Sequence, residues 1–309
     1  MGRCLSGFRT KPTSGLATWR RCLAAVLRQR QFEVQVLDFR QGFDRILEVV
    51  RATDPLLVGF SLIFQYYLPQ FAKLVAYLRG NNIECHFSVG GHYPSLRYAV
   101  VLEQIPQLDS VVRCEGELML GELMDCLADG RDWRQLPGLA YRQDYECRAS
   151  APRALIDDLD SLPYPMLPEQ DQVTLGKRAM PIVASRGCAR NCAFCSIRQF
   201  YAQVPGKKVH VRKPVKVAEQ MRACHEQRRT SIFLFQDDDF PVRGAFGRRW
   251  IDEFTRALDG EGLIGRTLWK IGFRADEIDP ELFAQMRTAG LYAVYLGLES
   301  GTPRAAHAE

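Results

Sequence analysis

The chain has 309 residues, enough for two domains of ordinary size, and 47% of them are hydrophobic, as in a packed globular protein. Its 41 basic and 36 acidic residues give a net charge of +5, too mild to indicate nucleic-acid binding, so no nucleic-acid partner is expected. No run of about 18 or more apolar residues is present, so we expect no membrane span.

The first half of the sequence alternates predicted strands with predicted helices. Because strands separated by helices pair in parallel, this pattern predicts an α/β fold in which residues 1–135 form a doubly wound, Rossmann-like parallel sheet. In such a sheet, ligands bind at the carboxyl ends of the strands. The predicted strands are short and apolar: Phe32–Phe39, Leu56–Leu62, Cys85–Gly91 and Ser110–Arg113.

A proline-rich stretch, residues 136–175, is predicted to connect this domain to a second one. Beyond it, residues 176–309 again alternate strands and helices, as in a (β/α) barrel whose active site lies above the carboxyl ends of its strands. Only four strand–helix units fit before Glu309, so we expect a partial barrel, truncated after its fourth strand. Those strands are predicted at Met180–Ser185, Ser231–Phe235, Leu268–Phe273 and Ala293–Leu298.

Three of the ten cysteines fall within eight residues, in the spacing Cys-x3-Cys-x2-Cys directly after a predicted strand. A loop can fold the thiolates of Cys188, Cys192 and Cys195 around one iron–sulfur cubane, and three ligands for four irons leave one iron open. Clustered thiols with no signal peptide indicate the reducing cytoplasm. The alternatives are a zinc site completed by Cys224 or His225, and ordinary unliganded cysteines.

The same motif resembles the signature of radical S-adenosylmethionine (SAM) enzymes, in which Phe194 matches the aromatic position before the third cysteine. The resemblance implies a [4Fe-4S] cluster on Cys188, Cys192 and Cys195 whose open iron chelates S-adenosyl-L-methionine, with Phe194 near the adenine. It also implies that an electron from the cluster cleaves this cofactor to a 5′-deoxyadenosyl radical. A reductant such as flavodoxin or ferredoxin would then supply the electron.

Two later segments resemble strand ends of the same barrel. Asp237 and Asp238 match the family's F-x-D-D-x-F pattern, and the resemblance implies that they face cofactor and substrate. Arg274 lies in a segment like the family's third strand, and its planar fork suits an anionic group on cofactor or substrate. The alternatives are a solvated turn or a helix N-cap for the aspartates, and an ion pair with Asp276 or Glu277 for Arg274.

The last strand segment resembles the family's Gly-x-Glu-Ser-Gly pattern, which Glu299 and Ser300 complete. The resemblance implies that these two residues contact the ribose or the methionine part of the cofactor. A glutamate that ends an apolar strand is otherwise often a helix cap, and that alternative stays open.

The first domain resembles the cobalamin-binding domain of these enzymes at the ends of its predicted strands. Ser61, Gly90, Gly91 and Glu115 lie there, and glycines let a backbone approach a large planar ligand. The resemblance implies a cobalamin whose corrin ring sits above the cluster, with one face toward the barrel.

Two features depart from that resemblance. No D-x-H-x-x-G motif is present, and His86 and His92 are the only histidines in the first half, so we expect no protein histidine on cobalt. His92 and Tyr93 either lie at the edge of the corrin or form an ordinary loop pair. Met1–Lys11 is a poor strand, although the family normally opens with a core strand.

Together these features predict a radical SAM enzyme that uses a [4Fe-4S] cluster, SAM and cobalamin. Its predicted reaction is cobalamin-dependent methylation, or a related radical modification, of an unactivated carbon. The substrate would be a small molecule, a lipid or a tetrapyrrole. The alternative is a truncated, non-catalytic or partner-dependent cluster-binding protein, because the sequence stops soon after the fourth predicted barrel strand.

Overall fold

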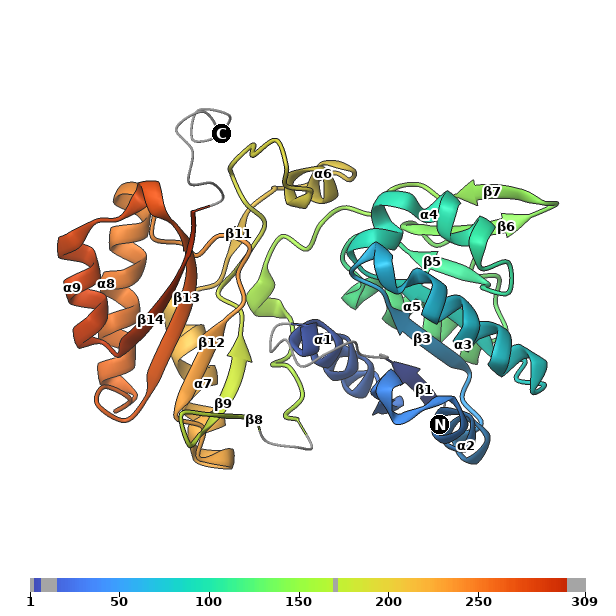
Figure 1. The fold of residues 1–309 in the computed structure, drawn as a ribbon, viewed down its shortest axis with the longest axis horizontal. Helices are drawn as coiled ribbons and strands as arrows, with labels where there is room; N and C mark the ends of the chain where they lie inside the picture. The colour runs from blue at the N-terminus through green and yellow to red at the C-terminus, as the bar shows by residue number, and fades with distance from the viewer. Residues whose placement is uncertain (1–2, 7–15, 169–171, 299–309) are drawn as a thin grey trace.

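The computed structural model describes residues 3–6, 16–168 and 172–298. These residues form two α/β domains that lie side by side, each built on its own sheet (Figure 1). This is the architecture that the alternating sequence pattern predicts. Within these ranges no helix combines the length and the apolar character needed to cross a membrane.

The first domain is built on a seven-stranded sheet. Five of its strands are parallel to one another, and the last two at one edge are antiparallel. In order across the sheet, the strands are β2 (Glu33–Val36), β1 (Arg3–Ser6), β3 (Leu57–Ser61), β4 (His86–Gly90), β5 (Ser110–Val112), β6 (Leu139–Gln143) and β7 (Glu146–Ala149).

Helices cover both faces of this sheet, which confirms the predicted doubly wound arrangement. Strand β3 shows how the sequence achieves this, because successive side chains of a strand point to opposite faces. Leu57 packs with α1 and α5, whereas Val58 and Phe60 pack with α2, α3 and α4. The helices are α1 (Leu16–Gln29), α2 (Phe43–Thr53), α3 (Leu68–Gly80), α4 (His92–Gln104) and α5 (Glu117–Ala128).

One strand of the first sheet was not expected from the sequence. Met1–Lys11 has the composition of a poor strand, yet Arg3–Ser6 forms β1, which pairs with β2 on one side and with β3 on the other. A strand between two partners makes hydrogen bonds along both edges, so its pairing outweighs a weak intrinsic preference. The expectation of a poor strand is therefore wrong for these four residues.

The stretch predicted as a connector, residues 136–175, contributes strands to both sheets. Its first part is the β6–β7 hairpin, whose two turn residues, Asp144 and Tyr145, have positive φ values of 50° and 63°. Left-handed residues at both positions suit the twist of a hairpin. At its other end, β8 (Gln172–Thr174) pairs with β9 (Lys177–Ile182). The boundaries at 1–135, 136–175 and 176–309 stay a prediction.

The second domain is built on a five-stranded sheet that is open within the described residues. Its four parallel strands match the predicted partial barrel, and β8 is the antiparallel fifth. Helices α7 (Pro214–Arg228), α8 (Gly244–Gly260) and α9 (Pro280–Thr288) pack on one face. The order across the sheet is β14 (Leu291–Gly297), β13 (Leu268–Arg274), β12 (Ile232–Phe235), β9 and β8.

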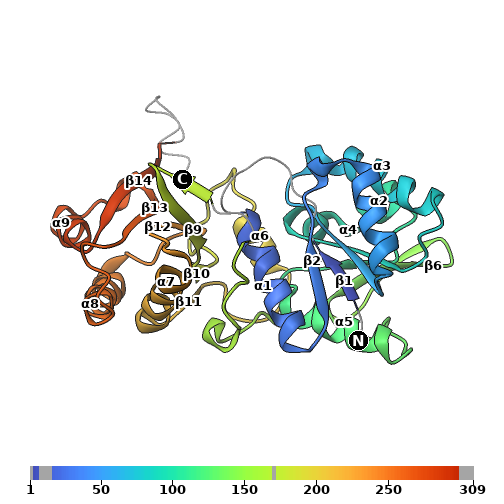
Figure 2. The ribbon, with the colours of Figure 1, turned by 90° about the horizontal axis from the view of Figure 1, so that it is seen from below.

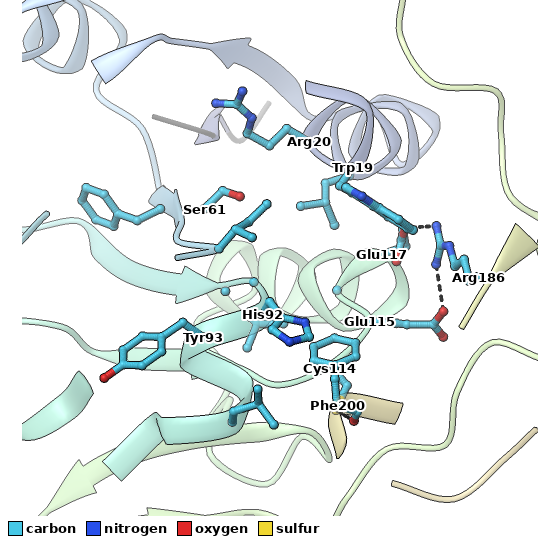
Figure 3. A pocket seen from close by; sticks show the side chains of 18 of the residues that line it. Trp19, Arg20, Ser61, His92, Tyr93, Cys114, Glu115, Glu117, Arg186 and Phe200 are labelled. Carbon is cyan, nitrogen blue, oxygen red and sulfur yellow. Dashed lines mark hydrogen bonds and ion pairs between the residues drawn. The ribbon is translucent and has the colours of Figure 1, made fainter. Parts of the chain in front are cut away.

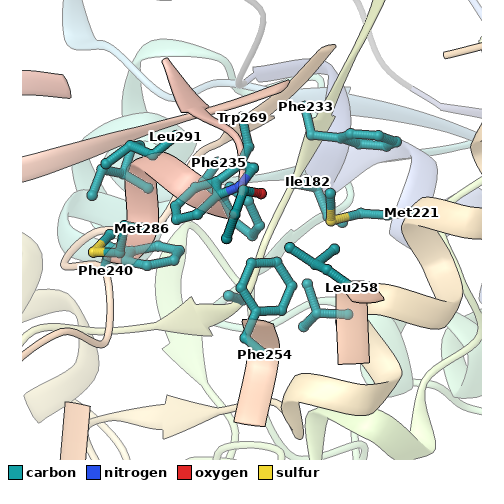
Figure 4. Packing of buried hydrophobic residues seen from close by; sticks show 14 of the residues in the cluster. Ile182, Met221, Phe233, Phe235, Phe240, Phe254, Leu258, Trp269, Met286 and Leu291 are labelled. Atoms are coloured by element: carbon teal, nitrogen blue, oxygen red, sulfur yellow. The ribbon is translucent and has the colours of Figure 1, made fainter. Parts of the chain in front are cut away.

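An aromatic cluster fills the space between this sheet and its helices (Figure 4). The rings of Phe235, Phe240, Phe254 and Trp269 have centroids 5.0 to 6.1 Å apart, mostly edge to face. The indole Nε1 of Trp269 donates to the carbonyl of Ala289 at 2.9 Å. This packing anchors β12 and β13, and so fixes the strand ends at which the site is built.

Candidate cofactor site between the domains

A cavity of about 830 Å³ lies between the two domains (Figure 3). Its walls come from the ends of β3, β4 and β5, from α1, and from the segments on either side of the three-cysteine motif. Helices α1 and α6 (Ile197–Ala202) lie between the two sheets (Figure 2). The cavity therefore stands where a parallel sheet is expected to bind its ligand, with the cysteine loop beside it.

The residues predicted to bind cobalamin all line this cavity: Ser61, Gly90, Gly91 and Glu115. Gly91 has a φ of +116°, and a Cβ atom there would lie 2.5 Å from the carbonyl oxygen of Leu62. Only glycine lets the turn from β4 into α4 pass so close to the end of β3. The structure thus brings the four residues together, and their contact with cobalamin stays a prediction.

Glu115 belongs to a buried ion-pair network that crosses between the domains. Arg186, at the end of β10 (Ser185–Arg186), donates to Glu115 at 2.9 Å and to Glu117 at 2.5 Å. Its guanidinium also lies 4.5 Å from the ring centroid of Trp19. Burial by itself would lower the pKa of Arg186, but the carboxylates of Glu117 and Glu115 raise it above its usual value. Arg186 and Glu117 are site residues that the sequence motifs do not identify as partners.

His92 makes a second link between the domains. It begins α4, its Nε2 lies 2.7 Å from the Ser196 hydroxyl oxygen, and its ring stacks on Phe200 of α6 with centroids 4.8 Å apart. The thiol of Cys114 donates to the carbonyl of Phe200 at 3.7 Å. Burial lowers the pKa of the His92 imidazole. His92 and Tyr93 both line the cavity and form the start of α4, not a loop pair, and their place at the edge of the corrin stays a prediction.

His86 has a different place. Its Nε2 lies 2.8 Å from the Ser110 hydroxyl inside the first sheet, and the ring of Trp133 packs edge-on against it. Burial lowers the pKa of His86 to about 4. This side chain is part of the core and is not among those that line the cavity.

The three cysteines lie on the loop that leaves β10. Gly187 has a φ of +83°, and a Cβ atom there would overlap the backbone carbonyl of Lys208, so the turn directly before Cys188 requires glycine. The amide of Cys195 donates to the carbonyl of Cys192 at 3.1 Å, which closes a turn between the second and third cysteines. The amide of Arg190 donates to the Cys188 sulfur at 3.4 Å.

This donor set fits an iron–sulfur cluster. The three thiols are all partly exposed. In the described part of the chain, no three His, Cys, Asp or Glu side chains are close enough to hold a single metal ion. A cubane binds each cysteine through a different iron, so it does not need such a tight group. The zinc alternative gains no support, because Cys224 packs in the core and His225 Nδ1 lies 2.8 Å from the Thr230 carbonyl.

Asp237 ties the end of β12 to the strand before the cysteine loop. Its carboxylate accepts hydrogen bonds from the amides of Ala184 and Ser185, and from the Ser185 hydroxyl at 2.7 Å. Burial raises the pKa of Asp237 to about 7. These donors give the carboxylate a structural role, and its predicted contact with cofactor or substrate stays a prediction.

Asp238 supports the turn that carries the first cysteine. It accepts hydrogen bonds from the Gly187 amide at 2.9 Å and from the Tyr201 hydroxyl at 3.3 Å. Burial raises the pKa of this carboxyl above its usual value. Asp238 also lines the cavity, as the prediction of a residue facing the cofactor requires.

Arg274 stands at the end of β13 and points to the cysteine loop. Its Nη1 donates to the Cys192 sulfur at 3.1 Å, and its Nε donates to Asp276 at 2.9 Å. The ion pair with Asp276 that the sequence allowed is therefore present, and a second arm of the guanidinium reaches a predicted cluster ligand. Hydrogen bonds to cysteine sulfur tune the potential of an iron–sulfur cluster.

The remaining predicted residues lie around the same loop or beyond the described part. Phe194 is 65% exposed, directly before the third cysteine. Its open ring has room for a stacking partner, and its proximity to adenine stays a prediction. Glu299 and Ser300 lie outside the described residues, so their predicted contacts with SAM also stay predictions.

Known protein families match the two halves separately. The B12 binding domain family matches residues 14–124, and the Radical SAM superfamily matches residues 182–308. The chain is a radical SAM protein with an N-terminal B12-binding domain. Domains of these two kinds hold cobalamin and a [4Fe-4S] cluster with SAM, so the family and cofactor predictions are confirmed.

Three relatives indicate the range of the family. An uncharacterized methyltransferase, PH0819, from Pyrococcus horikoshii is 30% identical over 96% of this chain. An anaerobic magnesium-protoporphyrin IX monomethyl ester cyclase from Synechocystis is 29% identical over 87%, and a hopanoid C-3 methylase from Methylococcus capsulatus is 25% identical over 90%. The chain spans only 62%, 53% and 52% of the lengths of these relatives.

Solved structures show the same fold. The radical SAM methyltransferase TsrM from Kitasatospora setae, with tryptophan substrate and a SAM analogue bound, superposes with a TM-score of 0.79 at 19% identity. The cobalamin-dependent enzyme OxsB, with aqua-cobalamin and SAM bound, superposes with a TM-score of 0.75 at 17% identity. The matches cover 98% and 99% of this chain and 60% and 45% of those chains. At this identity the likeness establishes the fold.

Proposed function

We propose that this chain forms the two-cofactor core of a cobalamin-dependent radical SAM enzyme that methylates an unactivated carbon. The observation that carries the proposal is the shared cavity. One wall of the cavity is made of the strand-end loops predicted to bind cobalamin. The other wall contains Arg186 and Ser196, which flank the cysteine loop. A ligand in this cavity lies against the strand-end loops of the first domain and against the residues on either side of the cysteine loop.

Each part of the chain has a defined task in this proposal. When bound, the cluster supplies the electron that cleaves SAM, and cobalamin supplies a methyl group for the substrate. Cys188, Cys192 and Cys195 hold the iron, and Arg274 donates a hydrogen bond to the Cys192 sulfur. Trp19 and Leu23 of α1 line the cavity, and the Gly90–Gly91 turn leaves space for a planar ring.

We also propose that no protein histidine binds the cobalt. His86 is bonded to Ser110 inside the sheet, and His92 is bonded to Ser196 of the second domain. Either imidazole would have to give up that partner to bind a metal through Nε2, and His86 is also not among the residues that line the cavity. A water or an open lower face of the corrin is the arrangement that these contacts favour.

The relatives support a second candidate for the outcome of the radical step. Three of them are named anaerobic magnesium-protoporphyrin IX monomethyl ester cyclases, at 27% to 30% identity. The candidate is radical modification of a tetrapyrrole without methyl transfer. The proposed substrate class is therefore a small molecule, with lipids and tetrapyrroles included, and the proposed electron donor is a carrier such as flavodoxin or ferredoxin.

The test is anaerobic reconstitution with iron, sulfide and hydroxocobalamin, followed by SAM and a strong reductant. We expect 5′-deoxyadenosine from radical cleavage and S-adenosylhomocysteine from methyl transfer to the corrin. A cyclase-type enzyme would form 5′-deoxyadenosine without S-adenosylhomocysteine. The variant with Cys188, Cys192 and Cys195 changed to Ala is the control and should form no 5′-deoxyadenosine. An intact cluster that forms neither product would contradict the proposal and favour a non-catalytic cluster-binding protein.

A further inference from the structure

The cysteine loop, residues 187–195, is held at both of its ends by the first domain. Arg186 directly precedes it and is bound by Glu115 and Glu117. Ser196 directly follows it and lies 2.7 Å from His92 Nε2. Figure 3 shows Arg186 beside Glu115 and Glu117, and His92 beside Phe200, around one cavity.

The Arg186 link is strong and directional. The side chains of Arg186, Glu115 and Glu117 are only 3% to 7% exposed, so each depends on the others for most of its polar contacts. Glu115 comes from the short loop between β5 and α5, Glu117 is the first residue of α5, and both line the cavity. Removing the guanidinium would leave two buried carboxylates facing each other, which strongly favours movement of the loop toward water.

The His92 link repeats this arrangement at the other end of the cysteine loop. His92 follows the Gly90–Gly91 turn, which also lines the cavity. Its ring is held on Phe200 by a stacked contact at an interplanar angle of 16°. Two segments at the strand ends of the first domain therefore contact the second domain, and each one holds a different end of the cysteine loop.

We propose that Arg186 and His92 are positioning residues that couple the cobalamin cavity to the cluster. The first-domain segments that carry Glu115, Glu117 and His92 hold the cysteine loop in the shape that binds the cluster, and the cysteine loop in turn holds these segments in place. This inference rests on the proposed function, because it requires that the chain binds both cofactors. It predicts that a change at either link disturbs both sites, even when the other cofactor is absent.

The experiment measures each site without the other cofactor. Hydroxocobalamin affinity is titrated in the background with Cys188, Cys192 and Cys195 changed to Ala, and the reduced cluster is examined by electron paramagnetic resonance in corrin-free protein. Arg186→Gln should weaken hydroxocobalamin binding about tenfold, as expected when the loop is displaced by the loss of one good contact. It should also broaden the cluster signal, because the ligands adopt more than one arrangement.

Arg79→Gln is the matched control. Like Arg186, Arg79 makes an ion pair, here a partly buried one with Asp109 at 2.6 Å. It lies within the first domain and is not among the residues that line the cavity. At equal loss of thermal stability, Arg79→Gln should leave the hydroxocobalamin affinity and the cluster signal unchanged. A merely structural role of Arg186 would make the two variants alike, and that result would overturn the inference.

Milder variants keep the test decisive if Arg186→Gln does not fold. Glu117→Gln retains the Arg186–Glu115 pair, and His92→Phe retains the stack on Phe200 while removing the bond to Ser196. Each should shift both readouts in the same direction as Arg186→Gln does. The effects of His92→Phe and Ser196→Ala should not be additive, because both substitutions remove the same hydrogen bond. If the wild-type protein binds both cofactors and these variants leave the hydroxocobalamin affinity and the cluster signal unchanged, only this inference is overturned. Wild-type protein that binds no corrin would overturn the proposed function as well.

Discussion

The two walls of the cavity are built in different ways. On the first-domain side, the strand ends present glycine turns, carboxylates that are already paired, and large side chains such as those of Trp19 and Phe64. On the second-domain side, the wall is made of the residues that flank the cysteine loop, of α6 and of Asp238, and behind it the thiols, aspartates and Arg274 bind one another through side chains. The first wall suits a large ligand that brings its own chemistry, and the second suits one assembled from the protein's own ligands.

The difference also explains how each wall keeps its shape. The turn at Gly91 is fixed by its close approach to the Leu62 carbonyl, a contact between two backbone segments of one domain. The turn at Gly187 is fixed by the Lys208 carbonyl and by the carboxylate of Asp238. We therefore expect damage to the first wall to affect corrin binding more than cluster content, and damage to the second wall to do the reverse.

The largest effect is expected from the three cysteines. Changing Cys188, Cys192 and Cys195 together to Ala should abolish cluster assembly, whereas the wild-type chain should take up about four iron and four sulfide. Hydroxocobalamin should still bind, because the triple variant leaves the first wall intact. Iron, sulfide and corrin analysis after anaerobic reconstitution checks this. Stoichiometric zinc with no capacity for iron would show that the metal site is assigned wrongly.

The next effect separates the two turns. Gly187→Ala and Gly91→Ala should each lower the free energy of unfolding by about 2–4 kcal/mol, since both add a Cβ that meets backbone at positive φ. Gly187→Ala should reduce iron uptake more than corrin affinity, and Gly91→Ala the reverse.

Gly176→Ala provides the control for these variants. Its φ is +70°, but a Cβ there meets nothing within 4 Å, so only the backbone preference should count, at about 1 kcal/mol. Urea unfolding of the three variants, alongside iron and corrin titrations, gives the comparison. Equal losses of stability in all three would show that close backbone contact does not shape these turns.

A smaller effect concerns His86, which lies in the first sheet away from the cavity. Its folded-state pKa of about 4 is below the unfolded value of about 6.5, so the unfolded chain binds the proton more readily. Its contribution is fully present above about pH 6.5 and is lost as the pH falls toward 4. We expect a loss of about 3 kcal/mol across this window, absent in His86→Gln. Urea unfolding at several pH values, in the variant with Cys188, Cys192 and Cys195 changed to Ala, measures it. Identical pH profiles for the two proteins would contradict the buried, neutral imidazole.

The smallest effect is expected at Phe194. Because the ring is 65% exposed, Phe194→Ala should change the free energy of unfolding by less than about 0.5 kcal/mol. If the ring stacks on the adenine of SAM, the variant should bind SAM about fivefold more weakly. Equilibrium binding to the reconstituted cluster measures this, with hydroxocobalamin affinity as the control. Unchanged SAM affinity would remove Phe194 from the site.

Local patterns in the sequence predict much of this molecule. The cysteine spacing, the apolar strands and the Gly90–Gly91 pair each depend on residues close together in the chain. The structure places the glycine pair in the cavity wall and the cysteine loop beside the cavity. Strand β1 escaped prediction because its place depends on two neighbours rather than on its own composition. The β6–β7 hairpin did have a local signal, the two-residue Asp144–Tyr145 turn.

The contacts between the domains were out of reach for a different reason. Arg186 is about 70 residues from Glu115 and Glu117, and Ser196 is 104 residues from His92, so their pairing follows only from the docking of two folded domains. A sequence pattern shows where these residues lie in the chain, but it does not show which side chains form ion pairs or hydrogen bonds with one another. The roles of Asp237 and Asp238 could not be predicted for the same reason, because their hydrogen-bond donors, the amides of Ala184 and Gly187, lie far from them in the sequence.

One measurement tests the central claim, that a single cavity brings the corrin against the cluster loop. Wild-type protein is loaded with cob(II)alamin, its cluster is reduced, and the cobalt signal is recorded by electron paramagnetic resonance beside that of the Cys188, Cys192 and Cys195 triple variant. Two paramagnets that share one cavity should interact, so the cobalt signal should broaden or split only when the cluster is present. A cobalt spectrum that is the same in both proteins, with corrin bound to each, would contradict the account.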